Sequence, residues 1–220
     1  MIPKLFSNKF LEKAKQMNIG IPQLLGFYES KLIFYPFITS KGMQDVRLAF
    51  HQSEEDDKFL IRYYKEYITD KMPLIEKAKA IAEAVNSRMA YQDDMAHYGQ
   101  AEFWNTPIGA HNAGIDDCDG SSVLITYLLR LFGAEENEVF TTTGYVKDPL
   151  KSKEGFHAYT SILDKETALM YPVEGSFYPK VSMRELGELP LHLNVRYRKV
   201  LWITNDKVSY SSIPMFRFVR

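Results

Sequence analysis

The single cysteine of the chain, Cys118, has the surroundings of a nucleophile. It lies in the segment Asp116-Asp117-Cys118-Asp119-Gly120, directly before an apolar run at helical spacing that extends from 123 to 132 and that Gly133 closes. We therefore expect the thiol in the first turn of a helix, where unpaired main-chain N–H groups and the helix dipole favour an anion. Such a thiol can act as a nucleophile if a base removes its proton.

A base and an orienting acid follow the cysteine on two segments with the pattern of β-strands. Of the five histidines, His157 lies at the start of the run 156–163, and Glu174 directly follows the next run, 168–173. A turn-forming segment separates the runs, which indicates an antiparallel pair in which the start of one strand lies beside the end of the other. Glu174 can then orient the imidazole of His157 while the ring accepts the proton of Cys118.

Each of these residues also has an ordinary structural role. A lone cysteine is more often a small buried hydrophobic residue than a nucleophile, and a lone histidine is more often a polar residue at the edge of a core. A zinc site built on His97, His111 and Cys118 lacks the close paired spacing of zinc ligands. Sequence order and placement together favour a Cys118–His157–Glu174 triad.

Helices are expected in the first part of the chain and strands in the second. Ser53, followed by four acidic residues, marks a helix start, and a second helix is expected from Pro73 through Val85. After the cysteine helix, short β-rich runs follow at 138–146, 156–163, 168–173, 197–204 and 208–211. A helix at 10–17 and a strand pair at 31–35 and 46–50 are also expected. The class is α+β, with helices packed on an antiparallel sheet.

Length and charge limit the kind of protein. The 220 residues suffice for one core, and we expect an N-terminal extension or subdomain at 1–70 packed on a catalytic core at 71–220. A net charge of -1 gives no attraction to nucleic acid or anionic membranes, and no segment has the length of a membrane span. Neither partner is expected, and nothing in the sequence indicates an oligomeric state.

The N-terminus and the cysteine content bear on location. The first ten residues contain lysines where a signal peptide needs an uninterrupted apolar stretch, and one cysteine excludes an internal disulfide. We expect a cytoplasmic protein, although a chain of this size is also compatible with export.

The segment from 80 to 176 resembles a known family. It carries, in order, Asn86, Tyr91 with Asp93, Gly99, Phe103-Trp104-Asn105-Thr106-Pro107, Gly114, Asp117-Cys118-Asp119-Gly120, Leu128-Leu129 and Gly133. This series is similar to that of bacterial transglutaminase-like cysteine peptidases, which run approximately V-N, Y-x-x-D, Y-W-x-T-P, G-D-C-E-D, a leucine-rich helix and a glycine. The resemblance implies a papain-related, transglutaminase-like core with Cys118, His157 and Glu174 in the triad positions.

Three departures from that pattern affect the candidate site. Asp116 occupies a position at which the family has glycine, and Gly120-Ser121 replaces an acidic-aromatic pair. Glu174 replaces the usual aspartate. A glutamate is one methylene longer, so it can still accept a hydrogen bond from the imidazole if its backbone lies farther back.

Acidic residues bracket the cysteine, and two roles fit them. Asp117 and Asp119 would raise the pKa of the Cys118 thiol, so a compensating positive charge is needed. The resemblance implies calcium, which prefers hard carboxylate oxygens, although the spacing does not match an EF-hand loop. The alternative is that these aspartates cap the helix and bind its first amides.

Three groups could stabilise an oxyanion at the cysteine. The main-chain N–H of Cys118 is the first, and the side chain of Asn112, six residues upstream, is a weaker second donor. The indole N–H of Trp104 is the third, although a tryptophan in this position is more often a core aromatic.

The expected activity is cysteine-dependent acyl transfer on protein or peptide amides, which on resemblance favours a cysteine peptidase. No cofactor is required by this chemistry, and the calcium just discussed is an open alternative to helix capping. Transglutaminase or amidase activity shares the same thioester and stays open. The competing class is a catalytically silent binding module with the same fold, suggested by the substitutions around Cys118, and a third alternative is a calcium-dependent structural protein.

Overall fold

A six-stranded antiparallel sheet forms one layer of the molecule, of which the computed structural model describes residue 12 and ranges 28–29, 46–147, 153–176, 190–191, 193–197 and 199–212. The sheet has the order β1-β8-β7-β4-β5-β6, and its neighbouring strands are all antiparallel. The strands are β1 (Tyr28–Glu29), β4 (Val139–Lys147), β5 (Glu154–Asp164), β6 (Leu169–Val173), β7 (Lys199–Thr204) and β8 (Ser209–Ser211). The predicted antiparallel sheet and its runs after the cysteine are confirmed.

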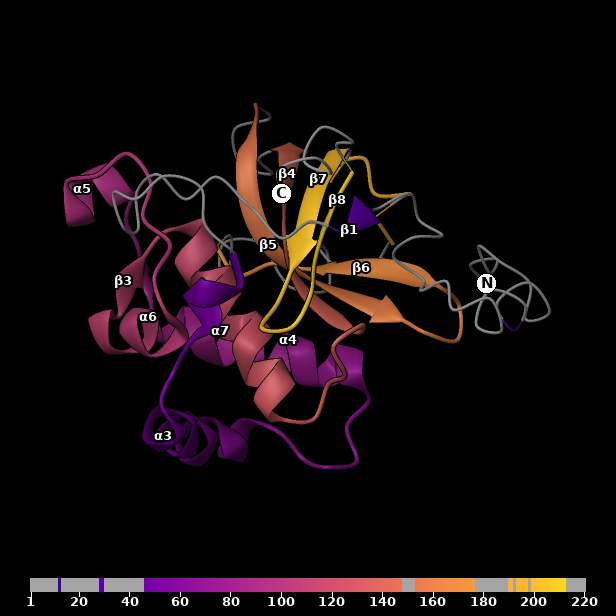
Figure 1. Cartoon of the computed structure of the whole chain (residues 1–220), viewed down its shortest axis with the longest axis horizontal. Coiled ribbons are helices and arrows are strands. Elements are labelled where there is room, and N and C mark those ends of the chain that lie inside the picture. Colours follow the sequence, from indigo (N-terminus) through magenta and orange to yellow (C-terminus); the bar gives the residue numbers. More distant parts are fainter. Residues whose placement is uncertain are drawn as a thin grey trace.

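The helices gather on one side of the molecule and the strands of the large sheet on the other (Figure 1). They are α3 (Glu54–Tyr64), α4 (Leu74–Arg88), α5 (Asp94–Tyr98), α6 (Pro107–Ala113) and α7 (Cys118–Leu131), with the 3-10 turns η1 (Val46–Phe50) and η2 (Lys65–Tyr67). Two short strands, β2 (Ala90–Tyr91) and β3 (Ile115–Asp116), form a separate parallel pair directly before α7. Neither this pair nor α5 and α6 was expected from the sequence.

The predicted helix starts agree with the observed ones. Ser53 forms a capping box, in which its hydroxyl accepts from the backbone of Asp56 and the Asp56 carboxylate accepts from Ser53 in return. Pro73 is the N-cap of α4. These local signals fix where the N-terminal helices begin, and the apolar sides of the helices then meet the core.

Helix α7 lies against the sheet through apolar and hydroxyl contacts. Its buried side chains include Leu124, Ile125 and Leu128. The hydroxyls of Thr141 on β4 and Thr160 on β5 both donate to the carbonyl of Ser122, at 3.1 and 3.2 Å. Because these bonds lie in a buried layer, they fix the position of the first turns of α7 relative to β5.

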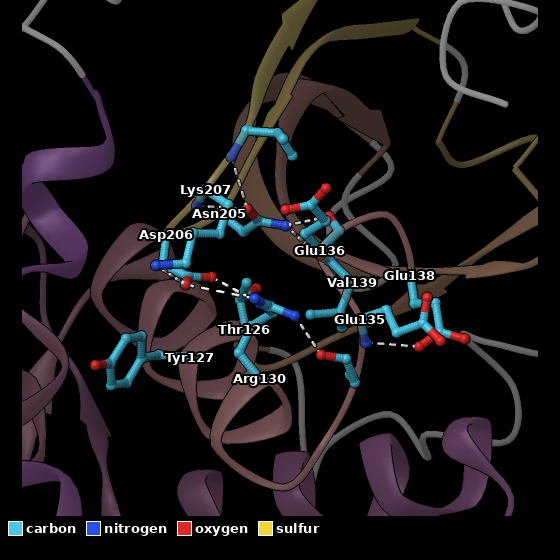
Figure 2. A network of polar contacts seen from close by, with 12 residues as sticks. Thr126, Tyr127, Arg130, Glu135, Glu136, Glu138, Val139, Asn205, Asp206 and Lys207 are labelled. Carbon is cyan, nitrogen blue, oxygen red and sulfur yellow. Dashed lines mark hydrogen bonds and ion pairs between the residues drawn. The ribbon is translucent and has the colours of Figure 1, made fainter. Parts of the chain in front are cut away.

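Polar contacts hold the other end of α7 to the turn between β7 and β8 (Figure 2). Arg130 Nε donates to Asp206 Oδ1 at 2.7 Å, and the same guanidinium donates to the carbonyl of Ala134. Asn205, which is fully buried, donates to the carbonyls of Glu136 and Val139 at 2.7 and 2.8 Å. The helix is thus fastened to the sheet at both ends.

The N-terminal part of the described chain belongs to the same core as α7. Phe50, Leu60 and Tyr64 are buried in one hydrophobic cluster with residues of α4 and α7. On α3 and η2, Leu60 and Tyr64 are buried, whereas Phe59, Tyr63 and Tyr67 are at least 36% exposed. The apolar side of α3 is therefore only partly covered by described residues.

The expected strand at 46–50 is wrong. These residues form the 3-10 helix η1, and Phe50 packs against Tyr127 of α7 with ring centroids 6.4 Å apart. Ala49 and Phe50 are both buried in the cluster that contains residues of α7, and burial of two neighbouring residues does not follow the alternation of a strand. The strand expected at 31–35 lies outside the described residues, as does the helix expected at 10–17 except for residue 12. None of the described helices is long and apolar enough to span a membrane.

Candidate active site

Cys118 is the first residue of α7, and its sulfur lies at the edge of β5. The N-cap Asp117 accepts from the backbone N–H of Asp119 at 3.1 Å, so the capping role proposed for the flanking aspartates is observed for one of them. The Ala158 N–H points at Cys118 Sγ, with 3.5 Å between nitrogen and sulfur. The thiol, which is partly buried, is therefore in contact with the residue that follows His157.

His157, the residue before Ala158, forms a buried pair with Glu174. The Nε2 atom of His157 lies 3.1 and 3.0 Å from the two carboxylate oxygens of Glu174. Glu174 is fully buried and accepts two further bonds, from the Ser176 N–H at 2.9 Å and from the Tyr197 hydroxyl at 3.1 Å. With Nε2 directed at the carboxylate, Nδ1 is the ring nitrogen through which His157 can exchange a proton with another group.

The sheet explains how residues far apart in the chain meet. The pairing of β5 with β6 ends at Thr160 and Val173, so Glu174 follows directly after the last residue of β6. Beyond that point the edge of β5 is met by the first residue of α7, since Ala158 contacts Cys118. The order of strands and the position of α7 therefore bring Glu174 to His157, and Cys118 to Ala158, the residue that follows His157.

Burial and the flanking carboxylates determine the electrostatics of the thiol. Burial raises the pKa of Cys118 well above its usual value, and Asp117 and Asp119 raise it further, whereas the Ala158 N–H lowers it. A thiolate at this position therefore needs a nearby positive charge, from a protonated His157 or from a bound cation. This agrees with the direction expected from the sequence.

Several further carboxylates converge beside the cysteine. Oxygens of Asp94, Glu102 and Asp119 lie within 4.8 Å of one another, and Asp94, Asp116 and Asp117 form a second such group. Burial, and then the charge of Asp117, raises the pKa of Asp94 to about 7. Asp119 is 1% exposed, and burial and then Asp117 raise its pKa as well.

Two of these carboxylates have oxygens without hydrogen-bond donors. Neither oxygen of Asp119, nor Oδ1 of Asp94, has a hydrogen-bond partner among the described residues. The other oxygen of Asp94 accepts from the Phe103 N–H. Buried carboxylates without partners are costly, and oxygen ligands clustered in this way suit a hard cation such as calcium.

Asp116 and Gly120, two departures from the family pattern, are linked in space. The Asp116 carboxylate lies over the first turn of α7, where a Cβ added at Gly120 would come within 2.2 Å of it. Asp116 is 2% exposed and accepts from the Asp117 N–H at 3.0 Å, the Asn105 amide at 3.1 Å and the Tyr98 hydroxyl at 3.2 Å. The glycine provides the space that the aspartate occupies.

The residues expected to support an oxyanion have different surroundings. Trp104 is 7% exposed, and its indole N–H donates to Glu102 Oε1 at 3.0 Å, beside the acidic group. Asn112 lies on α6 with an exposed side chain. The roles of both residues stay predictions, with the backbone N–H of Cys118 as the first donor.

Four residues of the site were not predicted from the sequence, namely Asp94, Glu102, Ser176 and Tyr197. The signal for Asp94 was present, because it follows Asp93 at the start of α5, but acidic residues at a helix start are common as caps. Tyr197 is far along the chain from Glu174, and no pattern connects them. Its role is visible only once β6 and the segment before β7 are placed side by side.

Comparison with known proteins identifies the fold. No known protein-family profile matches the chain, and no curated protein matches it. Among solved structures, the EGTA-treated form of LapG from Legionella pneumophila is similar with a TM-score of 0.50 and 14% identity, over 76% of this chain and 88% of LapG. Two further LapG structures, one of them calcium-bound, have TM-scores of 0.47 and 0.43 and identities of 14% and 15%, each over 70% of this chain and 87% of LapG.

The likeness to LapG covers most of both chains, and it supports the expected fold class of helices packed on an antiparallel sheet. At 14% identity the similarity extends to the fold. The chain shares with LapG an arrangement of helices and an antiparallel sheet.

Proposed function

We propose that the protein is a cysteine peptidase that cleaves protein or peptide amides through an acyl-enzyme. One observation carries this proposal. The imidazole of His157 is held by the buried carboxylate of Glu174 at 3.0 Å, and the backbone N–H of the next residue, Ala158, contacts Cys118 Sγ. These contacts support the assignment of Cys118 as nucleophile, His157 as base and Glu174 as orienting acid, the three groups that this kind of nucleophilic catalysis uses.

In the proposed reaction, His157 accepts the thiol proton as Cys118 Sγ attacks the carbonyl carbon of the scissile amide. The N–H of Cys118 at the start of α7 donates to the resulting oxyanion. Collapse of the intermediate breaks the C–N bond, and His157 returns the proton to the leaving amine. Water, deprotonated by His157, then hydrolyses the thioester, which releases the acid and restores the thiol.

Glu174 acts on this sequence through His157. Its carboxylate accepts the Nε2–H bond, which keeps Nδ1 available for proton transfer and stabilises the imidazolium once it forms. Tyr197 and Ser176 hold the carboxylate in place. Although glutamate is one methylene longer than the usual aspartate, both oxygens of Glu174 lie within hydrogen-bond distance of the His157 ring.

The acidic cluster beside the thiol fits a calcium ion. Asp94, Glu102 and Asp119 would hold it, since their oxygens lie within 4.8 Å of one another and those of Asp119 accept no hydrogen bond from described residues. Asp117, which groups with Asp94 and also with Asp119, would be a further ligand. A bound divalent cation would supply positive charge that lowers the pKa of Cys118. The protein residues keep the roles given above.

Alkylation of the thiol tests the proposal. We expect iodoacetamide to label Cys118 rapidly near neutral pH, and His157→Ala to slow this labelling at least tenfold. In parallel, the protein should cleave unfolded casein, and Cys118→Ala should abolish the cleavage. An inert thiol in a folded protein, with no cleavage, would contradict the proposal and support the binding-module alternative.

A further inference from the structure

Three aromatic side chains form a row on the sheet close to the thiol. Tyr145 on β4 and Phe156 on β5 are 40% and 47% exposed, and their ring centroids are 6.1 Å apart. Trp202 on β7 continues the row, 5.6 Å from Phe156. Large apolar side chains at this exposure on adjacent strands are a surface that binding can bury.

The row lies on the same face of the sheet as α7. Side chains alternate along a strand, so Phe156, Ala158 and Thr160 share one face of β5. Thr160 contacts Ser122 of α7, which assigns this face to the helix. Cys118 is the first residue of α7 and contacts Ala158. The aromatic row therefore lies next to the N-terminus of the helix, with Phe156 two residues along β5 from the residue that contacts the thiol.

The backbone of β5 has an unpaired edge at the same place. β4 pairs with β5 from Glu154 to Ile162, whereas β6 pairs with it only from Thr160 onward. The Ala158 N–H points away from β4 toward Cys118, and in an antiparallel strand Phe156 presents its N–H and C=O to the same edge. Among the described residues, no strand pairs with this edge.

We propose that the substrate binds as an extended segment along the edge of β5 from 154 to 156, and that Tyr145 and Phe156 form the subsite for a large apolar or aromatic side chain beside the scissile bond. This inference rests on the proposed function. The occupant is a polypeptide because the edge offers main-chain hydrogen bonds. A strand added along 154–156 would lie next to Ala158, whose N–H contacts Cys118 Sγ. The aromatic row then selects among side chains through apolar contact.

A cleavage-site profile tests the subsite. The probe is a defined mixture of synthetic peptides that together contain every pair of neighbouring residues, analysed by mass spectrometry. We expect the wild type to prefer a large apolar residue at one position next to the cleaved bond. Phe156→Ala and Tyr145→Ala should lower kcat/KM for the preferred peptides about tenfold, a change of about 1.4 kcal/mol in transition-state binding, and should flatten the preference. Phe156→Leu should retain most of it.

Two further measurements separate binding from catalysis and folding. The rate of Cys118 alkylation by iodoacetamide should be unchanged in these variants, since neither side chain takes part in proton transfer. Tyr67→Ala, which removes a 39% exposed aromatic side chain from η2, is the matched control and should keep the wild-type profile. N-methylation of a single backbone nitrogen in a preferred peptide should abolish cleavage at each position where that N–H would donate a hydrogen bond to the edge of β5.

The outcomes distinguish the two proposals. Wild-type cleavage with the same profile and rates in Phe156→Ala and Tyr145→Ala would refute the subsite and leave the peptidase intact. Cleavage that tolerates N-methylation at every position would refute the binding along β5. An inert Cys118 with no cleavage of any peptide would refute the proposed function and the subsite with it.

Discussion

Replacing Glu174 by glutamine tests whether its carboxylate sets the tautomer of His157. The amide oxygen of glutamine can accept from the Ser176 N–H, and its NH2 group can donate to the Tyr197 hydroxyl, which can turn to accept. The buried site therefore stays paired and the fold is retained. Nε2 then faces both an amide oxygen and an NH2 group, so the Nε2–H tautomer is no longer imposed and the imidazolium loses its negative partner, which makes His157 a weaker acceptor of the thiol proton.

The structure allows the size of this effect to be worked out. The change removes one charge-assisted hydrogen bond, which contributes about 1.5–3 kcal/mol. At about 1.4 kcal/mol for each factor of ten, the loss corresponds to about 10- to 150-fold in the rate of a step that needs the imidazolium. Tyr197→Phe removes a donor that only supports the carboxylate, and should slow the reaction by less than about tenfold.

The rate at which iodoacetamide alkylates Cys118 reports the reactivity of the thiol without a known substrate. Intact-mass spectrometry follows this labelling over a time on the order of minutes at several pH values between about 6 and 9. Glu83→Gln on the exposed side of α4 is the matched control and should react like the wild type. Circular dichroism checks that each variant is folded. If Glu174→Gln is labelled as fast as the wild type over this range, the carboxylate does not govern His157 and the proposed triad is wrong.

Three other predictions concern the metal, the pH and the folded state. Calcium at about 100 times its dissociation constant should stabilise the protein by about 2.7 kcal/mol and raise Tm by several degrees, and Asp119→Asn should remove most of the shift; an equal shift in the variant would exclude this residue as a ligand. Burial, and then Arg88, lowers the pKa of His111 from 6.5 to about 4. As the pH falls, His111 is therefore protonated in the unfolded chain before it is protonated in the folded protein. Urea titrations should show that the free energy of unfolding falls by up to about 3 kcal/mol between about pH 6.5 and pH 4, and His111→Asn should lack this loss. Asp206→Asn should lower the unfolding free energy by about 1–3 kcal/mol because it breaks the largely buried pair with Arg130, and no change in urea midpoint would contradict that role.

Local signals in the sequence were sufficient for the elements that carry the site. Ser53 and its acidic neighbours mark the start of α3, and the apolar run after Cys118 defines α7. The closeness of His157 and Glu174 follows from two alternating runs joined by a turn, because antiparallel pairing leaves few other arrangements. The catalytic roles of these residues stay predictions.

The remaining features depend on contacts between distant segments. The 3-10 helix at 46–50 has an apolar composition like that of a strand, and only its packing on α7 decides between them. Likewise, the convergence of Asp94 and Glu102 on Asp119 depends on how the segments before α7 fold back on its first turn. Periodicity within one segment contains no information on that placement.

The Asp116 and Gly120 pair has a consequence for recognising relatives of this protein. A side chain at 120 and the carboxylate of Asp116 would occupy the same space, so an acidic group over the first turn of α7 can come from either position, but not from both. Evolution can therefore exchange the two residues only as a coupled event. A search that scores alignment columns independently would count this exchange as two mismatches, whereas a comparison of paired positions would count it as one change.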